Sequence, residues 1–219
     1  EDALKYSVGF EGYLANMEGI YKNKLGGIVQ NAHFTTRDTR ITDQYYPIHK
    51  FSNPVKNNCK LTKCMIITGV NASGKTTFLK TTALNIIFTQ QFGVGFYTRC
   101  EMKPYTHIHS YLNIPDTSGR DSLFQAESRR CKEILDVVKD TPPYTHHFCI
   151  FDELYSGTNP KEASKSAYSF LHYLSSFLNV DFILTTHYVK VCRKLKKHKR
   201  IANYKMNVIR NTKIGRAHV

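Results

Sequence analysis

One short segment constrains the fold of this chain more than any other. Residues 69–76 read Gly-Val-Asn-Ala-Ser-Gly-Lys-Thr, the pattern G-x-x-x-x-G-K-[ST] of a phosphate-binding loop. An apolar, strand-like run (CMIIT, 64–68) precedes it, and a helix-like stretch follows from residue 75 to about 91. Glycines let successive backbone N–H groups converge on an anion, and the start of a helix adds its positive dipole end. The segment therefore predicts a nucleotide-binding α/β fold.

Two further apolar runs, FCIF (148–151) and DFILTT (181–186), favour buried strands. Between them we expect a helix with Asn159 as N-cap, Pro160 as its first residue and Glu162 completing a capping box. Its apolar face is expected to comprise Ala163, Ala167, Phe170, Leu171, Leu174 and Leu178. This strand–helix alternation predicts an α/β fold with a mostly parallel central sheet flanked by helices.

Polar residues follow two of these strands at the edge where open α/β sheets bind ligands. Asp152 and Glu153 end the run at 148–151, and His187 ends the run at 181–186. Beside a phosphate loop, Asp152 is expected to bind Mg²⁺ and Glu153 to act as a general base. His187 is expected to sense the γ-phosphate or to position water. The alternatives are a helix cap or loop acid for the carboxylates, and a structural role for the histidine.

Between the two phosphate motifs lies a second candidate anion site. A polar turn contains Ser118 and Gly119, and helical spacing begins at Ser122, with Leu123, Phe124, Cys131, Ile134, Leu135 and Val138 as apolar positions. Ser122 is therefore expected near a helix N-terminus, where N–H groups and the dipole favour phosphate. Because the first loop serves its own phosphate, this site is expected to serve the nucleotide of another chain.

The segments GVNASGKTT, SGRDSLFQAE, FDELYSGTN and TTHY occur in the order and spacing of the MutS family's ATPase domain. The chain resembles that domain over about residues 40–210, including the lead-in NPVKNNCKLTKCMIITG (53–69). Its Lys-, Asn- and Tyr-rich composition is most similar to MutS-like proteins of large DNA viruses. The resemblance implies a P-loop NTPase of the ABC type, using ATP and Mg²⁺.

The resemblance also implies roles for individual residues. Phosphate binding falls to Gly69, Val70, Asn71, Ala72, Ser73, Gly74, Lys75, Thr76 and Thr77. Thr76 and Asp152 would hold the metal, Glu153 and His187 would be catalytic, and Ser118, Gly119 and Ser122 would contact the partner's γ-phosphate. Phe51 would stack on adenine. The implied partners are a second copy or a MutS-like heterodimer partner, and double-stranded DNA bound through domains outside this chain.

We expect three segments. Residues 1–35 would end a helical lever or clamp region, and residues 36–212 would form the ATPase domain, truncated at its C-terminal end. Residues 213–219 would be a scar, because IGRAHV back-translates to the start of a sequencing adapter. If residues 213–219 are such a scar, the natural protein would continue beyond Thr212.

Three departures from the family pattern leave the function open. Val70 replaces a usual proline, Asp121 is an extra residue before Ser122, and YSGTN replaces GRGTS. The favoured hypothesis is an ATPase that drives a DNA clamp in mismatch repair. The alternatives are a nucleotide-gated binding module with negligible hydrolysis, or another ABC-type DNA-repair ATPase; a kinase is disfavoured because it would need a lid and an acceptor site.

Composition adds limits on partners and compartment. Thirty-one Lys and Arg against 17 Asp and Glu give a net charge of +14, and seven of the cations lie between Lys190 and Arg200. That stretch is equally compatible with a polyanion partner and with a solvated helix face. The six cysteines form no CxxC pair and are expected as free thiols in a reducing, intracellular compartment. No membrane span is expected, and His107 and His109 are expected to face solvent.

Overall fold

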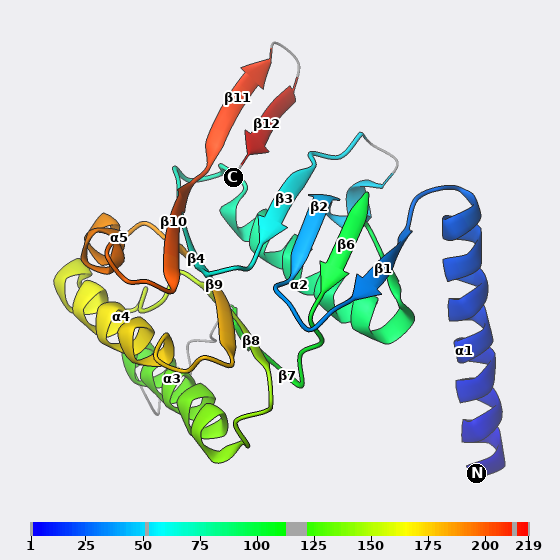
Figure 1. The fold of residues 1–219 in the computed structure, drawn as a ribbon, viewed down its shortest axis with the longest axis horizontal. Helices are drawn as coiled ribbons and strands as arrows, with labels where there is room; N and C mark the ends of the chain where they lie inside the picture. The colour runs from blue at the N-terminus through cyan, green and yellow to red at the C-terminus, as the bar shows by residue number, and fades with distance from the viewer. Residues whose placement is uncertain (1, 51–52, 113–121, 212–213, 219) are drawn as a thin grey trace.

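The structure is a computed structural model that describes residues 2–50, 53–112, 122–211 and 214–218. It confirms an α/β chain. Two five-stranded sheets lie side by side, with one helix between them, and three helices cover the far face of one sheet (Figure 1). A further long helix stands at the edge of the molecule.

One sheet is wholly parallel and is called the parallel sheet below. Its order is β10-β4-β9-β8-β7. The strands are β4 (Cys64–Thr68), β7 (His107–Tyr111), β8 (His147–Asp152), β9 (Val180–Thr186) and β10 (Ile201–Lys205). The three apolar runs predicted as strands are its three central strands, and every residue of β9 is buried. Fully buried parallel strands need apolar side chains on both faces, which explains their continuous runs.

The outer face of the parallel sheet packs against α3 (Leu123–Asp140), α4 (Pro160–Leu174) and α5 (Val189–Leu195). The start of α4 is as predicted, since Asn159 Oδ1 accepts hydrogen bonds from the N–H groups of Lys161 and Glu162. The capping box is not formed, because the Glu162 carboxylate accepts from the Thr158 hydroxyl instead. Leu178 was wrongly placed on the apolar face: α4 ends at Leu174, and Leu178 is 81% exposed.

The second sheet was not foreseen from the sequence and is called the mixed sheet. Its order is β3-β2-β6-β1-β5. The strands are β1 (Gln30–Phe34), β2 (Arg40–Gln44), β3 (Asn57–Lys60), β5 (Val94–Gly95) and β6 (Arg99–Met102). Only the β1–β6 pair is parallel, and β1 lies within residues 1–35. A 3-10 turn, η1 (Pro47–His49), follows β2.

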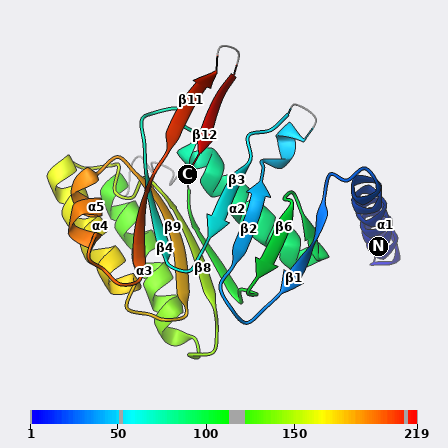
Figure 2. The same ribbon diagram turned by 45° about the horizontal axis from the view of Figure 1, so that its top comes forward.

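Helix α2 (Lys75–Phe92) packs between the two sheets. Its buried residues Phe78, Leu79 and Ile86 join Ile41 of the mixed sheet and Ile183 of the parallel sheet in one apolar core. The view in Figure 2 shows α2 behind the mixed sheet, with its N-terminal end near the upper end of β4. The loop predicted to bind phosphate is therefore anchored on both sides by core packing.

Helix α1 (Asp2–Leu25) has no buried residue. It ends at the Gly26-Gly27 pair, where Gly27 adopts a φ of +68°. Leu4, Tyr6 and Leu25 are all more than two-thirds exposed. At the other end of the chain, β11 (Asn207–Asn211) and β12 (Ile214–His218) form an antiparallel hairpin.

All six cysteines are free and buried, as expected. Burial raises the pKa of the Cys59 and Cys64 thiols to about 12, so both are inert, uncharged packing residues. Within the described part of the chain, no helix has both the length and the apolar character needed to cross a bilayer.

The expectation that His109 faces solvent was wrong. Its side chain is buried, with Nε2 3.0 Å from Nδ1 of His147, and the rings of His107 and His147 stack at 4.7 Å. His147 Nε2 lies 3.0 Å from the hydroxyls of both Thr141 and Thr145. Among the described residues no cluster of three or more His, Cys, Asp or Glu could hold a metal ion. Burial is the main reason that the pKa values of His109 and His147 fall to about 4.

These histidines predict acid sensitivity of the fold. Their folded-state pKa of about 4 lies below the ordinary 6.5, so the unfolded chain binds protons first, and stability falls as pH drops from about 6.5 to 4. We expect the Tm to fall between pH 7 and pH 4.5, and to fall less in His147→Asn. The exposed His33→Gln is the control and should behave as wild type. Equal losses in His147→Asn and wild type would contradict the prediction.

Candidate functional site

The loop between β4 and α2 has the strained backbone expected of a tight anion-binding turn. Ala72 and Gly74 adopt φ values of +58° and +91°, in the left-handed region. A Cβ on Gly69 would lie 2.7 Å from Ser73 Oγ and 3.0 Å from Met206 Cβ, so a larger residue would have to displace a neighbouring side chain. The Ser73 hydroxyl is buried and lacks a hydrogen-bond partner among the described residues. Val70, Asn71, Ala72 and Thr77 are exposed at the loop surface.

Lys75, the first residue of α2, is only 5% exposed. Its Nζ donates to the carbonyl oxygens of Gly69 and Val70, each at 3.1 Å, and lies 3.4 Å from His187 Nε2. The ammonium group is therefore folded over the loop and held against its carbonyl groups. An anion at the loop would meet this cation directly.

Asp152 ends β8 beside the loop. The Thr76 hydroxyl lies 3.1 and 3.0 Å from the two carboxylate oxygens of Asp152, and the Thr185 hydroxyl donates to Oδ1. Asp152 and Thr185 are direct neighbours in the β8–β9 ladder. The register of the parallel sheet therefore delivers the carboxylate to the start of α2.

Glu153 and His187 form a second contact at the same edge. His187 Nε2 lies 2.6 Å from Glu153 Oε1, and both side chains are partly exposed. In the tautomer with its proton on Nε2, the imidazole donates to the Glu153 carboxylate. Glu153 adopts a φ of +54°, and its N–H donates to the carbonyl oxygen of Thr185. The turn after β8 thus directs Glu153 toward the end of β9.

The residues that the structure brings together fit Mg²⁺ and a phosphate chain. Mg²⁺ binds through one or two carboxylates together with hydroxyl, water and phosphate oxygens, so the Thr76–Asp152 pair is a suitable partial set. The Ser73 hydroxyl has no partner among the described residues, and the Lys75 ammonium is bonded to carbonyl oxygens of the loop, so both are available to a phosphate bound there. The metal and nucleotide roles of these residues stay predictions.

The second predicted anion site is described only in part. Ser122 is the N-cap of α3, with a capping box in which its hydroxyl accepts from Gln125 N–H and the Gln125 side chain accepts from Ser122 N–H. Its side chain is exposed. Phe51, Ser118, Gly119 and Asp121 lie outside the described residues.

One residue of this region was missed by the sequence reading. Glu127, on α3, is 1% exposed and its carboxylate accepts hydrogen bonds from Ser156 and Gly157, just after Glu153. A signal was present, because Glu127 lies four residues from both Leu123 and Cys131 and so shares the apolar face of the helix. A single acidic residue on the apolar face of a helix indicates that its carboxylate is buried and has hydrogen-bond donors nearby.

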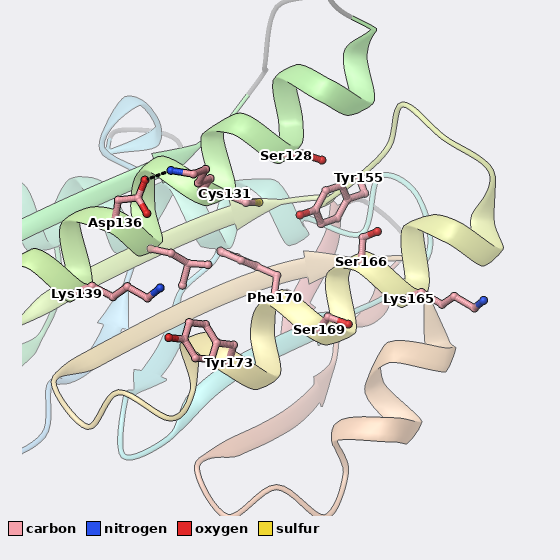
Figure 3. Close-up of a pocket in the computed structure, with 12 residues that line it drawn as sticks. Ser128, Cys131, Asp136, Lys139, Tyr155, Lys165, Ser166, Ser169, Phe170 and Tyr173 are labelled. Carbon is pink, nitrogen blue, oxygen red and sulfur yellow. Dashed lines mark hydrogen bonds and ion pairs between the residues drawn. The ribbon is translucent and has the colours of Figure 1, made fainter.

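A groove of about 610 Å³ lies between α3 and α4 and contains none of the predicted site residues. Figure 3 shows Tyr155 at one end of it, beside Ser128, with Phe170 and Tyr173 further along. Two of its lysines are engaged nearby: Lys132 pairs with Asp136 at 2.5 Å, and Lys139 lies over the ring of Tyr173.

Comparison with known proteins identifies the family. Residues 65–216, more than half of the chain, match the family model described as MutS domain V. The chain belongs to the MutS family. The matched region contains the loop, Asp152, Glu153 and His187, so the resemblance seen in the motifs agrees with the family assignment. The likeness to viral members stays a prediction.

Similar proteins carry three names within the MutS family. The chain is 29% identical over 186 residues to the DNA mismatch repair protein Msh3 of Dictyostelium discoideum. It is 28% identical over 158 residues to the endonuclease MutS2 of Staphylococcus haemolyticus, and 27% identical over 149 residues to the DNA mismatch repair protein MSH6 of Saccharomyces cerevisiae. These matches cover 81%, 71% and 66% of this chain but only 12%, 20% and 11% of the relatives.

Proposed function

We propose that this chain is the ATP-binding and ATP-hydrolysing domain of a MutS-like DNA repair protein, with a P-loop NTPase fold of the ABC type. One observation carries the proposal: Lys75, Thr76, Asp152, Glu153 and His187 meet where β8 and β9 end beside the start of α2. A cation, a hydroxyl–carboxylate pair and a second carboxylate in contact with a histidine are the groups that phosphoryl transfer to water needs.

Each group has a distinct task. The loop N–H groups and the dipole of α2 bind the phosphates, and Lys75 exchanges its carbonyl partners for phosphate oxygens. Thr76 and Asp152 would hold Mg²⁺, which when bound would neutralise charge on the phosphate oxygens. Glu153 accepts a proton from the attacking water, and His187 holds the Glu153 carboxylate in place.

The exposed N-cap of α3 supplies the link to a second chain. Ser122 and the turn before it would bind the γ-phosphate of a nucleotide held by a partner, which is a second copy or a related MutS-like chain. Since two relatives are named DNA mismatch repair proteins, we propose that this closure drives a clamp on double-stranded DNA inside the cell. The DNA contacts would come from parts of the protein outside this chain.

The trans site predicts that activity depends on protein concentration. ATP hydrolysis per chain should rise as the concentration increases through the range in which two chains associate, because Ser122 acts on the partner's nucleotide. The measurement is steady-state phosphate release at saturating ATP and Mg²⁺ over a wide protein range. A measurable rate that stays flat per chain would contradict a trans site.

The second candidate function is a nucleotide-gated binding module with negligible hydrolysis. The observation that favours it is the contact of His187 with Glu153, which occupies the carboxylate that would polarise water. Tyr155 in place of the family's glycine supports the same reading. ATP binding without phosphate release at any protein concentration would favour this module over the ATPase. A different ABC-type DNA-repair ATPase remains the alternative within the hydrolysing class.

A further inference from the structure

The loop that follows Glu153 is fastened to helix α3 by one buried carboxylate. Glu127 Oε1 accepts hydrogen bonds from the N–H of Ser156 at 2.8 Å and from its hydroxyl at 3.1 Å. Glu127 Oε2 accepts from the N–H of Gly157 at 3.2 Å. Both oxygens are therefore used, and the loop backbone supplies two of the three donors.

Two tyrosines complete the attachment. The Tyr111 hydroxyl accepts from the N–H of Tyr155 at 3.2 Å. Burial raises the pKa of Tyr111 and of Tyr155, so both hydroxyls keep their protons and remain donors. The Tyr188 hydroxyl, one residue after His187, donates to the carbonyl oxygen of Tyr155 at 3.4 Å.

The start of α3 also packs directly against this loop. A Cβ on Gly157 would lie 2.6 Å from Leu123 Cγ, so the first residue of α3 lies against the Gly157 backbone. Figure 3 shows Tyr155 at the end of the α3–α4 groove, close to Ser128, the neighbour of Glu127. Leu123 and Glu127 thus hold the N-terminal turns of α3, which begin after Ser122, against residues 156–157.

A buried carboxylate with its donors satisfied is costly to detach, because each unpaired group would lose its hydrogen bond without gaining water. The N-terminal turns of α3 and the loop after Glu153 should consequently move as one body. Any force applied at Ser122 is then transmitted through Glu127 to residues 155–157, which lie within four residues of Glu153.

We infer that Glu127 is a positioning residue that couples Ser122, where the partner's nucleotide would bind, to the placement of Glu153 in its own chain. The inference rests on the proposed function. Glu127 is buried, and it acts by holding residues 156–157 against α3. Binding of a partner's γ-phosphate at Ser122 in one chain would thereby position the Glu153 carboxylate of that same chain. The two nucleotide sites of the dimer would then hydrolyse ATP together.

The test is the full-length Glu127→Gln variant. A glutamine NH₂ group would face an N–H donor of Ser156 or Gly157, which breaks at least one bond of the attachment. We expect the Kd for ATP and the KM to stay within about threefold of wild type, and kcat to fall about 10- to 100-fold. The control is Glu133→Gln on the same helix, where the exposed carboxylate pairs with Arg130, and its kcat should match wild type.

A second variant tests the inference if Glu127→Gln does not fold. Ser156→Ala removes one side-chain bond to Glu127 and leaves both backbone bonds, so its Tm should match wild type and its kcat should fall about two- to fivefold. If Glu127→Gln unfolds, Ser156→Ala decides in its place. Unchanged kcat in the folded variant, or a raised KM with unchanged kcat, would overturn the inference while wild type still hydrolyses ATP. A wild-type chain that neither binds nor hydrolyses ATP overturns the proposed function, and the inference with it.

Discussion

Replacing Glu153 by glutamine is expected to lower ATP hydrolysis about 10²- to 10⁴-fold while ATP still binds. The amide keeps the size of the side chain and can still accept a hydrogen bond from His187 Nε2. It cannot take a proton from water, so only the chemical step is lost. The measurement is kcat from steady-state phosphate release, together with the Kd for ATP by equilibrium titration.

Glu162→Gln is the matched control. Glu162 is exposed in the first turn of α4, and it contacts the Thr158 hydroxyl, not the nucleotide site. Its variant should hydrolyse ATP at the wild-type rate. A Glu153→Gln chain that also keeps the wild-type rate would place the general base elsewhere and sink the assignment of Glu153.

Replacing Lys103 by methionine is expected to cost about 3 kcal/mol of unfolding free energy. Lys103 follows β6 of the mixed sheet, and its Nζ lies 2.9 Å from Oδ2 of Asp181, in β9 of the parallel sheet. Their side chains are only 15% and 9% exposed, so removing the cation leaves a buried carboxylate with the Tyr105 hydroxyl at 3.1 Å. For a chain of this size the loss corresponds to a Tm lower by about 6–12 °C.

The control lies on β6, the strand that precedes Lys103. Arg99 pairs with Glu101 at 2.6 Å, but the arginine is 75% exposed, so Arg99→Met should cost less than about 1 kcal/mol. Adding Asp181→Asn to Lys103→Met should recover part of the loss, because the uncompensated charge is removed. Equal effects of Lys103→Met and Arg99→Met in chemical denaturation would show that the two sheets are not held together by this pair.

The sequence by itself determined the elements whose signals are local. A helix start needs only a side-chain oxygen near its first N–H groups, so Asn159 could be placed as a cap, and Ser122 near a helix start, from neighbouring residues alone. A buried strand needs only a short apolar run, so β4, β8 and β9 were found. Because parallel strands present their carboxyl ends at one edge, the meeting of Asp152 and His187 with the loop could also be expected.

Only the tertiary structure decided what depends on partners distant along the chain. The mixed sheet pairs β1 with β6, about 70 residues later, and its short strands alternate too little to be recognised alone. Arg200, counted in a basic stretch, donates to carbonyl oxygens of Ser175, Phe177 and Val180. Glu127 and His109 are polar residues whose burial is stable only because distant groups satisfy their hydrogen bonds. Local sequence shows which side chains can be buried. The hydrogen-bond partners that allow a polar group to be buried come from distant parts of the chain, so they are known only from the folded structure.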